Sequence, residues 1–405
     1  MPSSLLLPTI SRRKFISGSA ALAVAYSMRD IAAAQHGTLR AYVGTYTGTG
    51  GNGEGIYLFS MNRATGELSD RKLAAKSPSP SWIVIHPSRR FLYAANEIND
   101  YEGNSGSISA FSIDAASGNL TLLNTVSSAG AGPAYLSLDT TGKFAFVANY
   151  AAGTLAVLPI LASGALGPAV FKRQDEGALG AAHATSAPAG SFANSGHDAP
   201  HVHMIAASPD NRFVLATDLG QDRIYIYSFD AKTGKLTPNS TAPFASLPSG
   251  DGPRHFAFHP NGHWLYAMQE ESSTVASFRY DAATGRLTPT QTISALPDGF
   301  AGTSFASEIL VSPEGKSLYA ANRLHDTIAV FAIHAQGRLS RMGETPTGGD
   351  YPVQCRIDPS ANFLFACNRK SDSITSFRIH RATGQLTSTG KFTAVGSPAS
   401  ITFLE

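Results

Sequence analysis

A short turn of the form Thr-Gly-x-Leu, or a close variant of it, recurs seven times along the 405-residue chain. Each copy follows one stretch of alternating polar and apolar residues and precedes another, which is typical of a β-hairpin whose glycine supplies the backbone freedom of the turn. Most copies stand about fifty residues apart, the length of a four-stranded propeller blade. The turns begin at Thr65, Ser117, Ser163, Thr233, Thr284, Gln336 and Thr383.

A second signal also recurs seven times, and it is a short apolar run, often aromatic, that ends in a recurring pair of residues. Another turn and strand lie upstream of most copies, so each unit contains four short strands, named A to D in order. We therefore predict an all-β fold, a seven-bladed β-propeller with four-stranded blades. The pairs that end strand B are Thr45-Tyr46, Asn96-Glu97, Asn149-Tyr150, Asp218-Leu219, Gln269-Glu270, Asn322-Arg323 and Asn368-Arg369.

The two ends of the chain complete this pattern. Residues 398–403 match strand A, whereas the first repeat begins with strand B at residues 39–46. The C-terminal strand is therefore expected to close the first blade, which removes two exposed sheet edges and ties the termini together. We predict that residues 38–405 form a single propeller domain.

Residues 171–200 depart from the regular spacing and are rich in Gly, Ala and Ser. This composition predicts a loop insertion at the surface, between the third and fourth blades. Two interpretations stay open: the loop shapes access to the central channel, or it is a tolerated insertion without such a role.

The N-terminal segment has the pattern of an export signal. The sequence Ser-Arg-Arg-Lys-Phe-Ile at residues 11–16 precedes an apolar stretch at 17–26, and three alanines at 32–34 offer a cleavage site. We expect residues 1–34 to be a twin-arginine signal peptide whose apolar part is too short to span a membrane stably. The mature protein would then be periplasmic or secreted, with no membrane association. The alternative is a disordered N-terminal tail.

Charge and motifs exclude several classes of function. The whole chain has 31 basic and 29 acidic residues, and loss of Arg12, Arg13, Lys14, Arg29 and Asp30 with the signal changes its net charge from +2 to −1. No basic surface therefore argues for nucleic acid as a partner. The sequence also lacks a Gly-x-Ser-x-Gly elbow, a Walker loop and a dinucleotide fingerprint, so neither covalent serine catalysis nor a nucleotide cofactor is supported. We expect no cofactor.

The two cysteines, Cys355 and Cys367, flank a predicted hairpin turn. A cross-strand disulfide is conceivable there. We expect two buried, unpaired thiols instead, because ordinary cross-strand positions often have the wrong geometry for a disulfide.

The mouth of the channel is the candidate site, because strand A is innermost and its first residues would line that mouth. The seven equivalent positions are Ser81, Ala134, His201, Arg254, Ser307, Val353 and Ala399. An antiparallel hairpin places the start of its first strand beside the end of its second, so charged residues that end strand B should lie on the same face. Those residues are Glu97, Glu270, Arg323 and Arg369.

His201 and His203 are two residues apart, so in a regular strand they would face the same side. A histidine pair could serve acid–base catalysis, since its pKa is near neutral, or it could be a satisfied structural pair. It could also bind a metal, but a metal site needs three or more convergent ligands and no standard spacing completes the set. We expect no metal.

Arg254 and Arg323 could form a fork for a carboxylate or a phosphate, because guanidinium groups recognise planar anions in a bidentate way. The alternative is a salt bridge to Glu270 that only links neighbouring blades, since a buried charge needs a partner whether or not it acts on a substrate. Glu270 itself could act as a base toward water or hold an arginine in place.

Three other histidines have structural interpretations. Strand alternation predicts that His255 points away from Arg254 and packs between blades, against Glu308. His259 and His263 lie at the far turn of the same hairpin, and we expect both to be structural.

In combination, several stretches resemble the seven-bladed propeller lactonase family, which is 6-phosphogluconolactonase-like and related to fungal carboxy-muconate cycloisomerases. The similarity covers almost the whole mature chain. It is carried by residues 42–47, 91–97, 147–150, 200–203, 252–255, 308–313 and 322–326.

The resemblance implies catalytic roles for a histidine of the Pro-His-x-His motif, His201 or His203, and for Arg254, Arg323 and Glu270. Residues 196–199 differ from an Arg-Gln pair that often precedes this motif in the family. Together with the export signal, that difference favours an unphosphorylated lactone as the substrate.

The expected function is metal-independent hydrolysis of a sugar or organic-acid lactone by a monomer. An arginine would hold the acidic group of the substrate or polarise the lactone carbonyl, and a histidine or Glu270 would activate water. Glu97 and Arg369 are the candidate substrate-binding residues. Two alternatives remain: cycloisomerase chemistry with the same groups, or a non-enzymatic propeller whose charged face binds a protein or a glycan.

Overall fold

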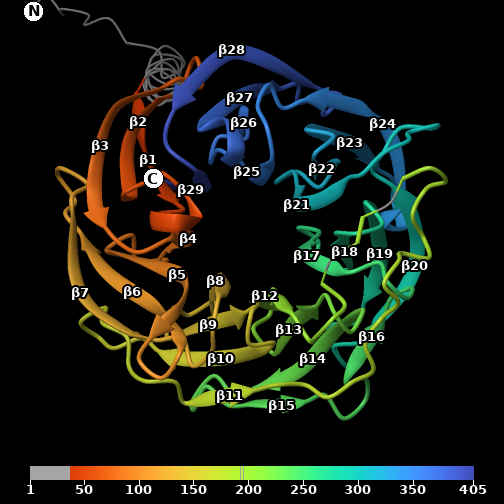
Figure 1. The fold of residues 1–405 in the computed structure, drawn as a ribbon, viewed down its shortest axis with the longest axis horizontal. Coiled ribbons are helices and arrows are strands. Elements are labelled where there is room, and N and C mark those ends of the chain that lie inside the picture. Colours follow the sequence, from red (N-terminus) through yellow and green to blue (C-terminus); the bar gives the residue numbers. More distant parts are fainter. Residues whose placement is uncertain (1–36, 192, 195) are drawn as a thin grey trace, which may run out of the picture.

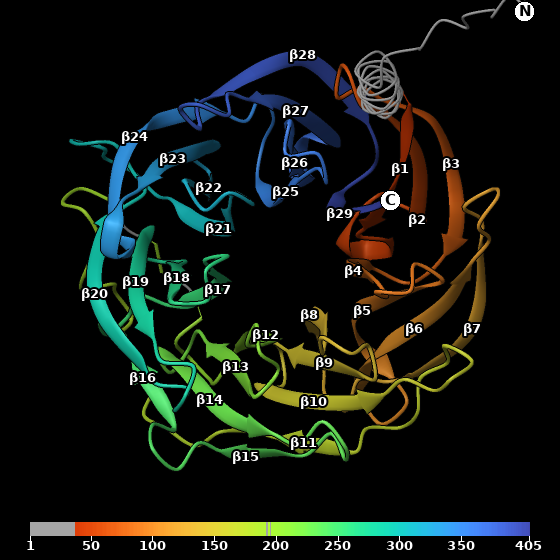
Figure 2. The ribbon, with the colours of Figure 1, turned by 180° about the vertical axis from the view of Figure 1, so that it is seen from behind.

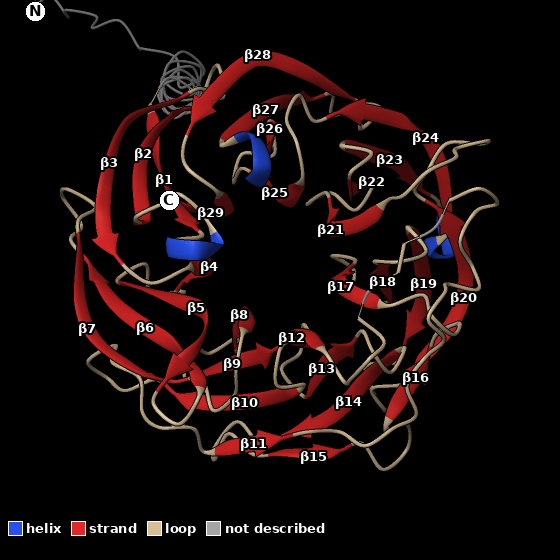
Figure 3. Cartoon of the chain, viewed as in Figure 1, coloured by secondary structure: helices blue, strands red, loops and turns tan. Residues whose placement is uncertain are grey.

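The computed structural model describes residues 37–191, 193–194 and 196–405, in which seven antiparallel sheets form a ring around a central channel (Figure 1). The predicted all-β, seven-bladed β-propeller is confirmed. Helix in the described residues is limited to short 3₁₀ segments at Gly48–Gly50, Ala335–Gly337 and Arg369–Ser371 (Figure 3). None of the described helices is long and apolar enough to cross a membrane. The predicted signal peptide, residues 1–34, lies outside the described residues.

From the channel outward, the first three blades contain the following strands. Blade 1 is β29 (Pro398–Leu404), β1 (Thr38–Thr45), β2 (Gly55–Asn62) and β3 (Leu68–Lys76); blade 2 is β4 (Pro80–Ile85), β5 (Phe91–Tyr101), β6 (Ser105–Ile113) and β7 (Leu120–Ser127); blade 3 is β8 (Pro133–Leu138), β9 (Phe144–Asn149), β10 (Thr154–Pro159) and β11 (Phe171–Arg173).

The remaining blades follow the same order. Blade 4 is β12 (Val202–Ala207), β13 (Phe213–Asp218) and β14 (Arg223–Phe229), with β15 (Leu236–Pro238) and β16 (Phe244–Ser246) outside; blade 5 is β17 (Pro253–Phe258), β18 (Trp264–Gln269), β19 (Thr274–Tyr280) and β20 (Leu287–Ser294); blade 6 is β21 (Phe305–Val311), β22 (Ser317–Arg323), β23 (Thr327–Ile333) and β24 (Leu339–Pro346); blade 7 is β25 (Pro352–Ile357), β26 (Phe363–Asn368), β27 (Ser373–Ile379) and β28 (Leu386–Ala394). In blade 4 the outer strand is divided, and both pieces pair with β14.

The C-terminal strand closes the ring, as the sequence predicts. β29 pairs with β1 in antiparallel register, with Val43 opposite Ile401, and the C-terminus lies beside blade 1 when the molecule is seen from behind (Figure 2). Blade 1 therefore holds both ends of the propeller together.

The two repeated sequence patterns, the turn and strand B, contact each other in the structure. In four blades the tyrosine of strand B donates a hydrogen bond to the turn glycine of the next blade, and each of these glycines has a positive φ. The bond joins neighbouring blades and gives the buried tyrosine hydroxyl a hydrogen-bond partner, which side-chain packing alone would not supply. The bonds are Tyr42 to Gly118 (2.6 Å), Tyr93 to Gly164 (3.0 Å), Tyr266 to Gly337 (3.1 Å) and Tyr319 to Gly384 (2.9 Å).

All seven innermost strands share an irregularity that controls which side chains reach the channel. A bulge interrupts the pairing of strands A and B one or two residues after strand A begins, in β4, β8, β12, β17, β21, β25 and β29. A bulge breaks the alternation of side chains between the two faces of a strand. Consecutive residues such as Arg254 and His255 can therefore both face the channel.

The predicted insertion begins slightly later than expected, because residues 171–173 are β11, the outer strand of blade 3. The loop that follows runs along blades 4 and 5 to the segment before β21. Its backbone contacts are Gly180 with Gly220 (2.9 Å), Thr185 with Ser249 (3.1 Å) and Gly190 with Gly302 (2.9 Å).

Cys355 and Cys367 are both buried and free, as expected. Burial is the main cause that raises the pKa of each thiol. Each therefore stays protonated and acts as a small apolar side chain in the core of blade 7.

Replacement of Phe363 by alanine is expected to lower the free energy of unfolding by about 3–5 kcal/mol. Its ring is fully buried in the apolar cluster that joins blade 7 to blade 1. Phe392→Ala, in the same blade, should change this free energy by no more than about 0.5 kcal/mol, since Phe392 is 63% exposed. Urea denaturation followed by circular dichroism measures both changes, and equal losses would contradict the importance of this junction.

Candidate active site

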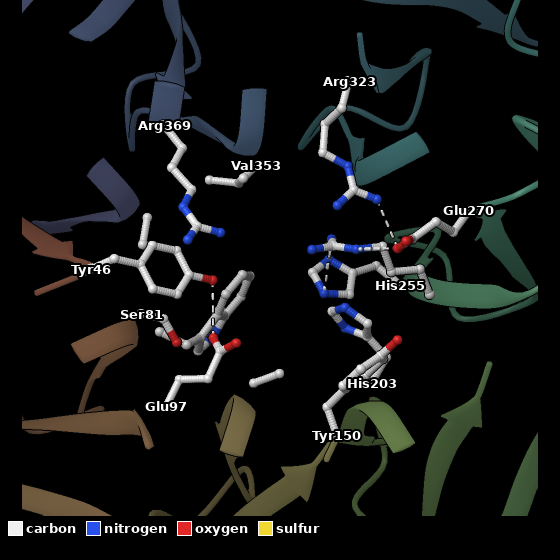
Figure 4. Close-up of a pocket in the computed structure, with 14 residues that line it drawn as sticks. Tyr46, Ser81, Glu97, Tyr150, His203, His255, Glu270, Arg323, Val353 and Arg369 are labelled. Carbon is white, nitrogen blue, oxygen red and sulfur yellow. Dashed lines mark hydrogen bonds and ion pairs between the residues drawn. The ribbon is translucent and has the colours of Figure 1, made fainter. Parts of the chain in front are cut away.

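A polar cavity of about 180 Å³ occupies one mouth of the channel (Figure 4). Its walls come from strand A and the end of strand B in blades 1, 2, 3, 5 and 7, from the end of strand B alone in blade 6, and from one residue of β12 in blade 4. The lining residues are Tyr46, Ser81, Trp82, Glu97, Ala134, Tyr150, His203, Arg254, His255, Glu270, Arg323, Val353, Arg369 and Ala399.

One carboxylate oxygen links the two predicted arginines. Arg254 Nε lies 3.0 Å from Glu270 Oε2, and Arg323 Nη2 lies 2.8 Å from the same oxygen. All three side chains are about nine-tenths buried. Arg254 belongs to β17, Glu270 directly follows β18, and Arg323 ends β22, so the cluster joins blades 5 and 6. The salt bridge considered from the sequence is therefore present, and it lies inside the cavity.

Backbone carbonyls fix the orientation of both guanidinium groups. Arg254 Nη1 donates to the carbonyl oxygen of Ser307 (2.6 Å), while Arg323 donates from Nε to Phe305 (3.2 Å) and from Nη2 to Ala306 (3.0 Å). Burial, followed by the charge of Arg323, lowers the pKa of Arg254. Two guanidinium groups held this close in a buried site create a strongly positive potential between them. This potential favours the binding of an anion and stabilises negative charge that develops during a reaction.

His203 faces the two guanidinium groups and lines the cavity. Burial lowers the pKa of His203 well below its usual value, and the charge of Arg254 lowers it further. The imidazole is therefore neutral near pH 7 and can accept a proton. Among the described residues, its Nδ1 has no hydrogen-bond partner.

His201 does not share this position, which corrects the expectation that both histidines face one side. It precedes β12, and a bulge separates Val202 from Met204, so strict alternation does not hold there. Its ring stacks on Tyr150, with centroids 4.4 Å apart. Its Nδ1 lies 3.0 Å from the carbonyl oxygen of Tyr150 and its Nε2 lies 3.1 Å from Asp198 Oδ1. His201 thus supports the cavity wall from behind.

His255 also differs from the expectation, since it lines the cavity together with Arg254. The bulge in β17 brings both side chains to the channel. The expected contact with Glu308 is nevertheless present, with Nδ1 3.0 Å from Oε1. Burial raises the pKa of Glu308 to about 7 and lowers the pKa of His255. The contact between Glu308 and His255 fixes the orientation of the His255 ring, which lines the cavity.

A second polar group lies across the cavity from Glu270 and Arg323 (Figure 4). Tyr46 donates a hydrogen bond of 3.0 Å to Glu97 Oε2, and the Arg369 guanidinium carbon lies 3.8 Å from the centroid of the Tyr46 ring. Burial raises the pKa of Glu97. The predicted substrate-binding residues Glu97 and Arg369 therefore stand opposite the arginine pair, with room for a small molecule between the two groups.

The remaining two histidines lie at the other end of their hairpin. His259 Nε2 is 2.9 Å from the carbonyl oxygen of Gly315 in the next blade, and His263 is exposed. Neither lines the cavity.

The sequence also contained a signal for lining residues that were not predicted. In each pair that ends strand B the first member is fully buried, whereas six of the second members line the cavity. Tyr46 and Tyr150 occupy this second position, but the prediction selected only the charged residues there. The six are Tyr46, Glu97, Tyr150, Glu270, Arg323 and Arg369.

Replacement of Glu270 by glutamine should lower the free energy of unfolding by about 3 kcal/mol, because it leaves two buried guanidinium groups without their counter-ion. The matched control is Glu405→Gln, which removes an ion pair of 2.9 Å with Arg89 between two exposed side chains. That change should cost no more than about 1 kcal/mol. Urea denaturation of both variants tests the difference, and a Glu270→Gln protein as stable as the control would contradict it.

Known proteins share this sequence and architecture. The sequence model described as "Lactonase, 7-bladed beta-propeller" matches residues 40–403. A protein of Bacillus subtilis (strain 168) named 6-phosphogluconolactonase is 34% identical over 364 residues, which cover 90% of this chain and 97% of the relative.

Two solved structures are similar over their whole length. A putative 6-phosphogluconolactonase from Bacteroides fragilis NCTC 9343 is 33% identical with a TM-score of 0.80, and the match covers 91% of this chain and 98% of the other. The periplasmic gluconolactonase of Pseudomonas aeruginosa is 29% identical with a TM-score of 0.80, covering 91% and 99%. The expected resemblance and the expectation of a lactone-hydrolysing enzyme are thus confirmed. The chain belongs to the lactonase family of seven-bladed β-propellers.

Proposed function

We propose that this protein hydrolyses a sugar lactone in the cavity at the channel mouth, with Arg254 and Arg323 as the electrophilic groups and His203 as the base. The observation that carries the proposal is the juxtaposition of two cations, held by one buried carboxylate, with a neutral imidazole on the same cavity wall. Hydrolysis of a lactone needs both groups, because negative charge develops on the carbonyl oxygen while water loses a proton.

In the proposed reaction the lactone carbonyl oxygen accepts hydrogen bonds from the guanidinium groups. His203 takes a proton from water as the water oxygen bonds to the carbonyl carbon. The tetrahedral intermediate carries its negative charge beside Arg254 and Arg323, where the fixed donors stabilise it. The ring C–O bond then breaks, the leaving oxygen receives the proton from the His203 imidazolium, and the product is an open-chain hydroxy acid.

Glu270 is assigned to holding the arginines rather than to activating water. Its Oε2 already pairs with both Arg254 and Arg323, so this oxygen is occupied by two cationic donors and is not directed at a water molecule. This leaves His203 as the general base.

The opposite wall supports a polyhydroxylated substrate. Glu97, Ser81 and Tyr46 supply a carboxylate and two hydroxyls, which match the donors and acceptors of sugar hydroxyl groups.

The names of two relatives indicate gluconolactone substrates. The Bacillus subtilis protein is named for the phosphorylated lactone, and the Pseudomonas aeruginosa protein is named a periplasmic gluconolactonase. We propose an unphosphorylated sugar lactone, because the sequence at residues 11–16 has the twin-arginine export pattern and would place the mature enzyme outside the cytoplasm. Fractionation of the native cells tests that location.

We also propose that the reaction requires no metal ion and that the enzyme acts as a monomer. In the part of the chain that the structure describes, no three His, Cys, Asp or Glu side chains converge in a way that could hold a metal. The charged groups that line the cavity belong to blades 2, 5, 6 and 7 of a single propeller.

The direct test is an assay of the purified mature protein with glucono-1,5-lactone and its 6-phosphate, followed by acid release. We expect turnover of the unphosphorylated lactone, unchanged by EDTA. His203→Ala should lower kcat by about 10²–10⁴-fold, the usual contribution of a general base. His259→Ala is the matched control, because it removes a histidine outside the cavity, and it should keep full activity. Hydrolysis of neither lactone by the folded protein would overturn the proposal.

The dependence of kcat/KM on pH provides a separate prediction. A histidine is active as a base only when deprotonated, and the pKa of His203 is lowered, so activity should persist below pH 6.5 before it falls. Removal of a positive charge with Arg254→Gln should raise the pKa of His203 and move the acid limb of the residual activity upward. Arg254→Lys keeps the charge, so the limb should stay at low pH. Identical limbs in the two variants would contradict the assignment of the base.

A further inference from the structure

One position of the propeller repeat adopts a backbone conformation that favours glycine. In five blades the residue directly before the first proline of the innermost strand has a positive φ. Glycine adopts this conformation freely, and small residues tolerate it better than bulky ones. The five residues are Ser79 (φ 42°), Gly132 (φ 60°), Gly252 (φ 68°), Tyr351 (φ 63°) and Ser397 (φ 40°).

Tyr351 is the exception to this pattern, because it places a large side chain where the repeat otherwise has Gly or Ser. A bulky residue with positive φ is uncommon, and such residues are concentrated at functional sites. The turn itself does not require tyrosine, since Gly252 makes the equivalent turn in blade 5. The reason for tyrosine at this position must therefore lie in its ring.

The ring of Tyr351 contacts a residue of the candidate site. The Arg323 guanidinium carbon lies 5.2 Å from the centroid of the Tyr351 ring and 5.7 Å from that of Phe305. The same guanidinium forms the 2.8 Å ion pair with Glu270 that is visible in Figure 4. Two aromatic rings and one carboxylate thus surround the Arg323 head group, and aromatic faces attract guanidinium groups.

Lys370 contacts the same ring. Its Nζ is 4.2 Å from the centroid of the Tyr351 ring, and its side chain is exposed. The half-buried tyrosine therefore contacts both the Arg323 guanidinium of the cavity and a cation at the surface.

We propose that Tyr351 is a positioning residue for Arg323. Its ring holds the guanidinium in place beside Glu270 and toward the cavity, and this contact offsets the unfavourable backbone conformation. The inference rests on the proposed function, in which Arg323 stabilises the developing oxyanion. Tyr351 itself does not line the cavity, so its effect should appear in kcat rather than in substrate binding.

The test compares variants at position 351 in the full mature protein with glucono-1,5-lactone as the substrate. Tyr351→Phe keeps the aromatic face and should retain kcat within about twofold. Tyr351→Gly relieves the backbone and removes the ring, and it should lower kcat about tenfold with little change in KM. Tyr351→Asn provides a second ring-less variant, because asparagine tolerates this backbone conformation.

A control in the same blade separates backbone relief from loss of the ring. Ala361 also has a positive φ (55°), in the turn between β25 and β26, where its amide donates to Asp358. Ala361→Gly should relieve the same kind of conformation and leave kcat unchanged.

The outcomes are distinct. If Arg323→Ala loses activity while Tyr351→Gly and Tyr351→Asn keep the wild-type kcat, the inference is overturned and the proposed function stands. If Arg323→Ala keeps full activity, the proposed role of Arg323 fails, and the inference fails with it. A loss of kcat in the ring-less variants that Tyr351→Phe restores supports the inference.

Discussion

The carboxylate of Glu270 is the shared counter-ion of two guanidinium groups that come from different blades. Arg254 lies on the innermost strand of blade 5 and Arg323 ends the second strand of blade 6, so neither cation could stay buried at the channel mouth without this shared partner. The electrostatics of the cavity follow from the arrangement. Burial and, after it, the charges of Arg254 and Arg323 lower the pKa of His203, and the neutral imidazole that results is the group proposed to take a proton from water.

The propeller repeat separates support from chemistry within each blade. The first member of the pair that ends strand B is polar and fully buried in every blade, and the tyrosine-to-glycine hydrogen bonds join one blade to the next. These contacts are common to many blades. The following residue reaches the channel in six blades, where it is a tyrosine, a glutamate or an arginine. Seven similar units can therefore form an asymmetric site, because the positions that support the sheet are different from those that line the cavity.

The fold was predictable because its signals are repeated. Seven turns and seven strand ends give the number of blades, and the unmatched strand at residues 398–403 gives the closure with β1. The charged lining residues were predictable for a related reason, since the antiparallel hairpin places Arg254 beside Glu270. The conformation of the strands at the channel mouth was not predictable. The bulges in β12 and β17 disrupt strict alternation, so His203 and His255 line the cavity while His201 does not.

The central claim is that the lactone carbonyl meets the arginine pair beside His203. A crystal structure of the mature protein with a lactam analogue of the sugar lactone, which resists hydrolysis, tests it most directly. We predict that the lactam carbonyl oxygen lies within hydrogen-bonding distance of Arg254 or Arg323, with ring hydroxyls toward Glu97. Binding of the analogue outside this cavity, or within it without contact to either arginine, would contradict the account.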